Sequence, residues 1–132
     1  MEFIEWDSSF ETDIKIIDAQ HKVLVKKVNQ LYEFIESNSI EKIYPLIDEV
    51  LEFAYYHFET EENYFAIFNY KEKLEHMKEH DEFRVFIHGI KKEDIGNMDF
   101  NRKLLEYLST WILHHIKEID MKYVEFLKKN LS

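Results

Sequence analysis

The chain has 132 residues, of which 45% are hydrophobic and 16% aromatic, with two glycines and one proline. This composition predicts one all-α domain rather than a β architecture with tight turns. The formal net charge of −10 argues against nucleic acid or a membrane surface as a partner, and the absence of cysteine excludes disulfides, thiolate catalysis and iron–sulfur clusters.

The first predicted elements are an N-terminal arm over residues 1–17 and a helix from about Asp18, where a single domain over residues 18–132 begins. Phe3, Trp6 and Phe10 follow no sustained helical period, so we expect the arm to pack these rings on the domain. Asp18 is a plausible N-cap. The helix should stop at the polar residues 37–39.

The second and third helices follow. The second is expected to end near Phe65, and Pro45 predicts a break or kink near its start because proline removes the amide that would bond the carbonyl of Glu41. The third should end at Gly89, as helices often do at a glycine. Residues 91–99 are expected to form a loop.

The fourth helix is expected over about residues 100–128. Residues at helical spacing predict its buried face: Leu104, Leu108, Trp111, Ile112, His115, Ile119 and Phe126. Four helices joined by short loops predict an antiparallel up-down-up-down four-helix bundle behind the N-terminal arm.

Seven histidines and carboxylates fall on the apolar faces of these helices. Burying such groups costs several kcal/mol unless something binds them. Two pairs, His57-x-x-x-Glu61 and His76-x-x-x-His80, have the i,i+4 spacing that places both side chains on one helical face. The set predicts a metal site with nitrogen and oxygen ligands from His21, His57, Glu61, His76, His80, His115 and Asp120.

Bundle topology predicts that these residues meet. In an antiparallel bundle, the start of the first helix lies beside the end of the second, the start of the third and the end of the fourth. The seven residues obey that order, so at a rise of 1.5 Å per residue they can converge within roughly 10 Å.

The spacing of His115 and Asp120 is irregular, because five residues turn Asp120 by about 140° from His115 on an ideal α-helix. Using Asp120 as a ligand requires a local π-bulge or a carboxylate that reaches across the seam. His114-x-x-x-Glu118 is a competing pair with regular spacing, but it projects from the flank of the helix. His88 and His114 are expected at the surface, and Glu59 to Glu62, Glu61 excepted, on a solvated helix face.

Spacing alone does not choose the metal, since imidazole suits zinc, iron, copper and nickel. For two octahedral irons, the imidazoles, two bridging carboxylates and one bridging hydroxide leave one coordination position open. Diiron oxygenases of the bundle class use a set richer in carboxylates. A histidine-rich set therefore favours reversible binding of a small ligand.

Together these motifs resemble the hemerythrin family, in particular its single-domain bacteriohemerythrins, over nearly the whole chain. The resemblance is carried by Ile17-Asp18-Ala19-Gln20-His21, His57-Phe58-x-x-Glu61, His76-x-x-x-His80-x-x-Phe83 and Trp111-x-x-x-His115-x-x-x-x-Asp120.

The resemblance implies two irons bridged by an oxo or hydroxo group and by the carboxylates of Glu61 and Asp120. It also implies that one iron is saturated by three imidazoles, while the other has two and an open position for dioxygen. The first set is His76, His80 and His115, and the second is His21 and His57.

Reversible binding of dioxygen, for storage, delivery or sensing, is therefore the expected function, and the protein is not expected to be an enzyme. An apolar ligand pocket is expected from Phe58, Phe83, Trp111 and Ile112. The alternatives are a diiron enzyme acting on peroxide or nitric oxide, and an iron-buffering protein. With no export signal and no run of about 18 apolar residues, a cytoplasmic monomer with no membrane or nucleic-acid partner is expected.

Overall fold

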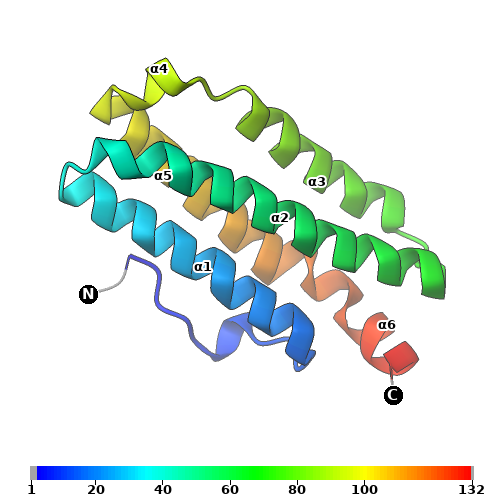
Figure 1. Cartoon of the computed structure of the whole chain (residues 1–132). Coiled ribbons are helices and arrows are strands. Elements are labelled where there is room, and N and C mark those ends of the chain that lie inside the picture. Colours follow the sequence, from blue (N-terminus) through cyan, green and yellow to red (C-terminus); the bar gives the residue numbers. More distant parts are fainter. Residues whose placement is uncertain (1–2, 132) are drawn as a thin grey trace.

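The computed structural model describes residues 3–131, and within that range every regular element is a helix. The elements are η1 (Ser8–Phe10), α1 (Lys15–Glu36), α2 (Ile40–Phe68), α3 (Lys73–His88), α4 (Lys92–Ile95), α5 (Met98–His114), η2 (His115–Ile119) and α6 (Met121–Leu131). The long helices lie side by side, and α5, η2 and α6 follow one another as a single rod (Figure 1). The fold is consistent with a four-helix bundle.

Helix α1 begins at Lys15, before the expected start at Asp18, and its N-cap is Ile14. Asp18 is therefore not the cap, contrary to the sequence-based prediction. Its carboxylate lies in the first turn and accepts hydrogen bonds from the backbone N–H (2.9 Å) and the hydroxyl (2.8 Å) of Thr12. A buried carboxylate thus ties the chain that precedes the helix to its first turn.

Helix α2 runs through Pro45 as one element, so the predicted break is wrong, and the alternative of a kink within a continuous helix stays a prediction. Proline removes only one amide from the helical ladder, and the buried apolar residues on either side hold this segment in the core. They are Ile43, Leu46, Ile47 and Val50. The helix ends at Asn69, whose left-handed backbone (φ 55°, ψ 54°) suits an asparagine C-cap.

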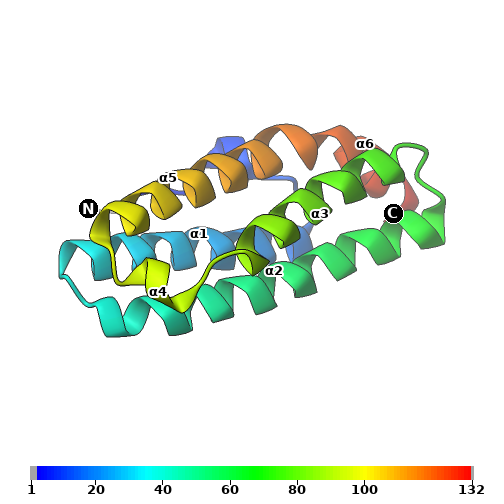
Figure 2. The same cartoon turned by 90° about the horizontal axis from the view of Figure 1, so that it is seen from above.

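The connection after α3 also differs from the expectation. Helix α3 does end before Gly89, but this glycine is right-handed (φ −78°) rather than left-handed. Residues 91–99 contain the short helix α4 instead of only a loop, because Ile95 is buried in the main core (2% exposed) and anchors the turn. Seen from above, α4 lies at the same end of the molecule as the α1–α2 connection (Figure 2).

The core is divided into two clusters along the bundle. The larger contains Phe58 and Phe83 and extends along α1, α2 and α5, whereas the smaller contains Phe65 and Tyr123 at the other end. His80 stacks on Phe58 of the first cluster, and His76 contacts Phe65 of the second. A layer of buried polar residues therefore lies between the two apolar clusters.

The N-terminal segment packs on the bundle through its aromatic rings. Trp6 stacks on Phe10 (4.9 Å between centroids) and Phe3 on Tyr32 (5.0 Å). The side chain of Asn29 bonds both the N–H and the carbonyl of Ile4. Among residues 3–131, no helix is long and apolar enough to cross a membrane.

Candidate metal centre

The polar layer contains all seven residues selected from the sequence, and each side chain is at most 5% exposed. Four segments supply them. His21 comes from α1, His57 and Glu61 from α2, His76 and His80 from α3, and His115 and Asp120 from the two ends of the π-helical turn η2.

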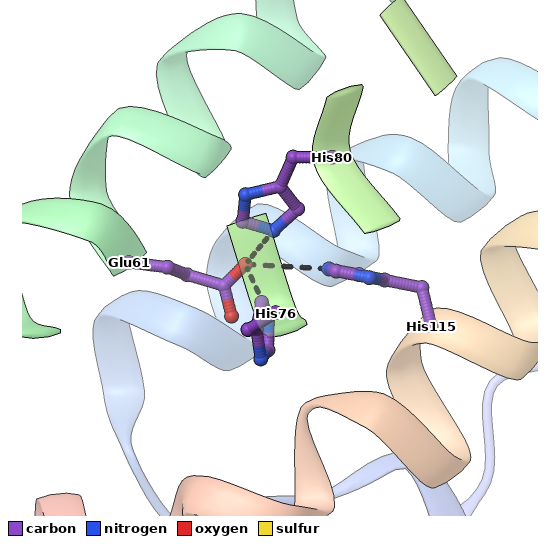
Figure 3. A group of neighbouring side chains, drawn as sticks. All are labelled: Glu61, His76, His80 and His115. Carbon is purple, nitrogen blue, oxygen red and sulfur yellow. Dashed lines mark hydrogen bonds and ion pairs between the residues drawn. The ribbon is translucent and has the colours of Figure 1, made fainter. Parts of the chain in front are cut away.

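The potential ligand atoms form two overlapping groups, each with its atoms within 4.8 Å of one another. Both groups contain Glu61. The first adds His76, His80 and His115, whose imidazoles converge on one oxygen of Glu61 (Figure 3). The second adds His21, His57 and Asp120.

The carboxylate of Asp120 faces both groups through different oxygens. Its Oδ1 lies 2.9 Å from Nε2 of His76 and 3.0 Å from Nε2 of His115. Its Oδ2 lies 2.6 Å from Nε2 of His21 and 3.6 Å from Nε2 of His57. A carboxylate turned in this way has the geometry of a bridge between two cation positions.

Glu61 also faces both groups. Its Oε1 lies 3.1 Å from Nε2 of His57 and of His80, and 3.2 Å from Nε2 of His115. All five imidazoles therefore present Nε2 to the two carboxylates, which leaves each Nδ1 on the outside of the cluster.

The donor set fits a resident metal. Nε2 of His57, Nε2 of His76 and Oδ1 of Asp120 are buried and lie close to groups of opposite charge, but within residues 3–131 none of the three makes a hydrogen bond of good geometry. Leaving such atoms without a hydrogen bond is costly, and metal coordination satisfies them. Imidazole nitrogens with carboxylate oxygens are ligands that iron and zinc both accept.

The π-helical turn explains the five-residue spacing of His115 and Asp120. The N–H of Asp120 donates to the carbonyl of His115 at 2.7 Å, an i,i+5 bond that replaces the usual α-helical one. The wider turn brings both side chains to the inside, as the π-bulge prediction required. The competing pair, His114 and Glu118, is exposed and forms its own ion pair at 2.8 Å.

In the metal-free cluster the imidazoles differ in pKa, because burial and the nearby carboxylates act on them to different extents. Burial lowers the pKa of His57 and His76, but the facing carboxylates of Glu61 and Asp120 outweigh it and raise the pKa to about 10 and about 9. For His115 burial wins and lowers the pKa to about 4. Without a cation, the two carboxylates are compensated by protons on imidazole.

Three residues outside the ligand set hold it in place. Nδ1 of His57 lies 2.6 Å from Oε1 of Gln20, and Nδ1 of His80 lies 2.7 Å from Oε2 of Glu62. The buried phenol of Tyr123 donates to Oε2 of Glu61. Glu62 is half-buried against His80, rather than on the solvated face that its acidic neighbours predicted.

Two of these residues carried a usable signal in the sequence. Gln20 directly precedes His21 within the first motif, and Tyr123 follows Asp120 at i+3, on the same helical face. For Glu62 the pattern gave no signal, because its neighbours on α2 are mostly polar and its partner His80 lies on another helix.

The four expected pocket residues lie together beside the cluster. Phe58 stacks on the ring of His80 (3.9 Å between centroids, 10° between planes), and Trp111 stacks on His115 (4.7 Å, 11°). Phe83 packs between Phe58 and Trp111 at 5.8 and 4.4 Å. Together with the buried Ile112, these rings form an apolar wall beside His80 and His115, in which Trp111 is half-buried.

His76 is the ligand candidate nearest to the surface. A hollow of about 190 Å³ borders it, and three glutamates and a lysine contribute to its lining. These are Glu72, Glu75, Glu79 and Lys122, with Tyr70 and Ile119 completing the hollow.

Comparison with known proteins agrees with this geometry. Residues 12–127 match the model of the hemerythrin HHE cation binding domain. The chain belongs to the hemerythrin family. The matched range contains all seven cluster residues, so the buried polar layer is part of the hemerythrin domain itself.

Hemerythrin relatives resemble the chain over most of its length. It is 34% identical to a bacteriohemerythrin of Clostridium acetobutylicum over 126 residues, covering 91% of this chain and 98% of that one. It is 33% identical to a hemerythrin-like protein of Naegleria gruberi, covering 89% and 88%. A crystal structure of wild-type hemerythrin has the same fold, with a TM-score of 0.81 at 23% identity, covering 95% and 98% of the chains.

Proposed function

We propose that the protein binds dioxygen reversibly at a centre of two irons. The observation that carries the proposal is the pair of overlapping ligand groups that share Glu61, with the carboxylate of Asp120 facing both. Glu61 belongs to both groups, and Asp120 turns one oxygen to each side. Similarity to bacteriohemerythrins supports the choice of iron and dioxygen.

Under this proposal the two cation positions differ in their protein ligands. His76, His80 and His115 would hold one iron, and His21 and His57 the other. Glu61 and Asp120 would bridge them. When bound, the irons would supply electrons and one exchangeable coordination position, on the side that has fewer imidazoles.

The residues around the centre orient its ligand side chains, exclude water and supply hydrogen bonds. Phe58, Phe83, Trp111 and Ile112 would form the apolar wall that excludes water and larger ligands. Gln20 and Glu62 fix the rings of His57 and His80, so that Nε2 of each points at the centre. Because every ligand side chain is already buried, binding needs no rearrangement of the helices.

The antiparallel up-down-up-down order of the helices belongs to the same proposal. In Figure 1 the residue colours run along α1 and α2 in opposite directions, which supports it. The antiparallel order is also supported by the meeting of the seven cluster residues, some of which lie near the start of their helix and others near the end. We further propose that the bundle acts as one domain with the predicted N-terminal arm packed on it, although residues 15–17 of that arm form the first turn of α1.

Anaerobic reduction followed by titration with air tests the function. The protein should contain about two irons per chain, and air should produce a charge-transfer absorption band that disappears on deoxygenation. A band that forms once and never reverses would refute reversible binding. Steady consumption of peroxide or nitric oxide, lost in a His57→Ala variant, would show an enzyme instead. A metal content other than two irons would refute the diiron centre.

A further inference from the structure

The outer nitrogens of two cluster histidines have partners of different charge. Nδ1 of His80 lies 2.7 Å from a carboxylate oxygen of Glu62, whereas Nδ1 of His57 lies 2.6 Å from the amide oxygen of Gln20. His80 belongs to the three-histidine group and His57 to the other. The two halves of the cluster therefore have an anionic and a neutral outer partner.

Whether Nδ1 of each histidine carries a proton depends on whether its partner can donate or only accept a hydrogen bond. A carboxylate only accepts, so Nδ1 of His80 is the donor. The amide nitrogen of Gln20 donates to the hydroxyl of Thr60 at 3.0 Å, and that hydroxyl donates to the carbonyl of Tyr56 at 3.1 Å. The oxygen of Gln20 is then left for His57, whose Nδ1 is also the donor.

Glu62 is held as an anion by its surroundings. Nη2 of Arg84 lies 3.2 Å from the same oxygen that His80 bonds, and Nη1 of Arg84 bonds Asp81 at 2.6 Å. The carboxylate is only 21% exposed, so solvent screens it incompletely.

An anionic acceptor strengthens the bond from Nδ1 and increases the electron density that Nε2 offers to a metal. A more basic ligand favours the higher charge state of iron. A neutral amide, such as that of Gln20, increases the electron density on Nε2 less than a carboxylate does. We propose that Glu62 is a positioning residue that, through His80, lowers the reduction potential of the iron held by the three-histidine group relative to its neighbour. This inference rests on the proposed diiron function.

The charge of Arg84 limits this effect. Its guanidinium lies beside Glu62 and 5.2 Å from the ring centre of Phe58, which itself stacks on His80. Removing the guanidinium leaves Glu62 with less compensation, so its hydrogen bond to His80 becomes stronger. Glu62 and Arg84 should therefore shift the potential in opposite directions.

The test is a potentiometric titration of the iron-loaded protein, with the spectrum as the readout. Glu62→Gln keeps the shape of the side chain and removes its charge. We expect the ratio of reduced to oxidised iron at a fixed potential to rise about tenfold, which corresponds to about 59 mV for one electron. The matched control is Glu59→Gln, which removes the same charge from an exposed position on α2 and should change the ratio less than twofold.

Arg84→Gln supplies an independent arm and should lower the ratio. Equal potentials for wild type, Glu62→Gln and Glu59→Gln would overturn the inference. If Glu62→Gln fails to hold two irons, the potential of Arg84→Gln decides, and an unchanged value overturns the inference. A wild-type protein without two irons would instead refute the proposed function, so the two failures are distinguishable.

Discussion

Removing the metal should make the stability of the protein fall as the pH rises above about 6.5. In the metal-free cluster, His57 and His76 keep their protons because Glu61 and Asp120 face them. Burial opposes these protons, but the carboxylates raise the pKa of His57 to about 10 and that of His76 to about 9. The unfolded chain binds the same protons with a pKa of about 6.5.

The direction in which stability changes with pH follows from the number of protons that the folded and unfolded states bind. Between pH 6.5 and 10 the folded protein holds protons that the unfolded chain has lost, so stability decreases as the pH rises. The two histidines correspond to contributions on the order of 5 kcal/mol for His57 and on the order of 3 kcal/mol for His76. Both imidazoliums share the same carboxylates, so the contributions are not additive. We expect a total loss of about 3–5 kcal/mol, complete near pH 10.

Below pH 6.5 stability changes with pH in the opposite direction, because of His115. Burial lowers the pKa of this imidazole to about 4, so the unfolded chain takes up a proton before the folded protein does. Stability therefore falls between pH 6.5 and 4. The carboxylates of Glu61 and Asp120, whose pKa values are lowered by the facing imidazoles against the effect of burial, add to this loss in acid. The metal-free protein should be most stable near pH 6.5.

Urea unfolding at pH 6.5, 8 and 9.5 measures the effect in metal-free and iron-loaded protein. The metal-free midpoint should decrease steadily over this range. The loaded midpoint should be higher at every pH and change less, because the metal takes the place of the imidazole protons. A metal-free protein that is equally stable at pH 6.5 and 9.5 would refute the electrostatic account of the cluster.

Three substitutions test the packing around the centre. Phe58→Ala should lower the free energy of unfolding by about 3–5 kcal/mol, measured by thermal or urea unfolding. The control Tyr56→Ala truncates an exposed ring of the same helix and should change the free energy of unfolding far less. Similar losses in the two variants would contradict the central role of the Phe58 stack. Tyr123→Phe removes the phenol that bonds Glu61 and should increase the rate of iron release to a chelator about 10–100-fold. An unchanged release rate would show that this hydrogen bond does not orient Glu61. Pro45→Ala restores an amide within α2 and should stabilise the protein by on the order of 1 kcal/mol, and a destabilised variant would show that the proline shapes the helix.

Helical periodicity predicted the parts of the fold that bury an apolar face. Leu24, Val28 and Leu31 on α1, and Leu104 and Leu108 on α5, are buried as their spacing indicates. Element ends were predicted less well, since they depend on single contacts. The start of α1 is fixed by Asp18 bonding back to Thr12, and α4 forms because Ile95 reaches the core. Neither contact has a periodic signature.

The cluster was predictable because burial of ionisable groups is rare and therefore informative. Six of the seven residues follow from i,i+4 pairs or isolated histidines on apolar faces. The outer partners were harder to predict, because Glu62 and Arg84 read as ordinary charged residues of exposed faces. Their roles depend on the packing of α3 against α2, which brings both Arg84 and His80 to the same oxygen of Glu62.

The π-helical turn also changes which residues of η2 and α6 are buried. A regular α-helix would have continued the buried face of Leu108, Ile112 and His115 to Ile119 and Phe126, and both are only half-buried. The extra residue in the turn shifts the face by one position, so that Asp120, Tyr123 and Leu127 are fully buried instead. The same shift thus brings the carboxylate of Asp120 into the polar cluster, together with the phenol that bonds Glu61 and the apolar residues of the second cluster. The position of Asp120 and the packing of α6 are set by one local change, which explains why a motif with five-residue spacing is compatible with an otherwise regular bundle.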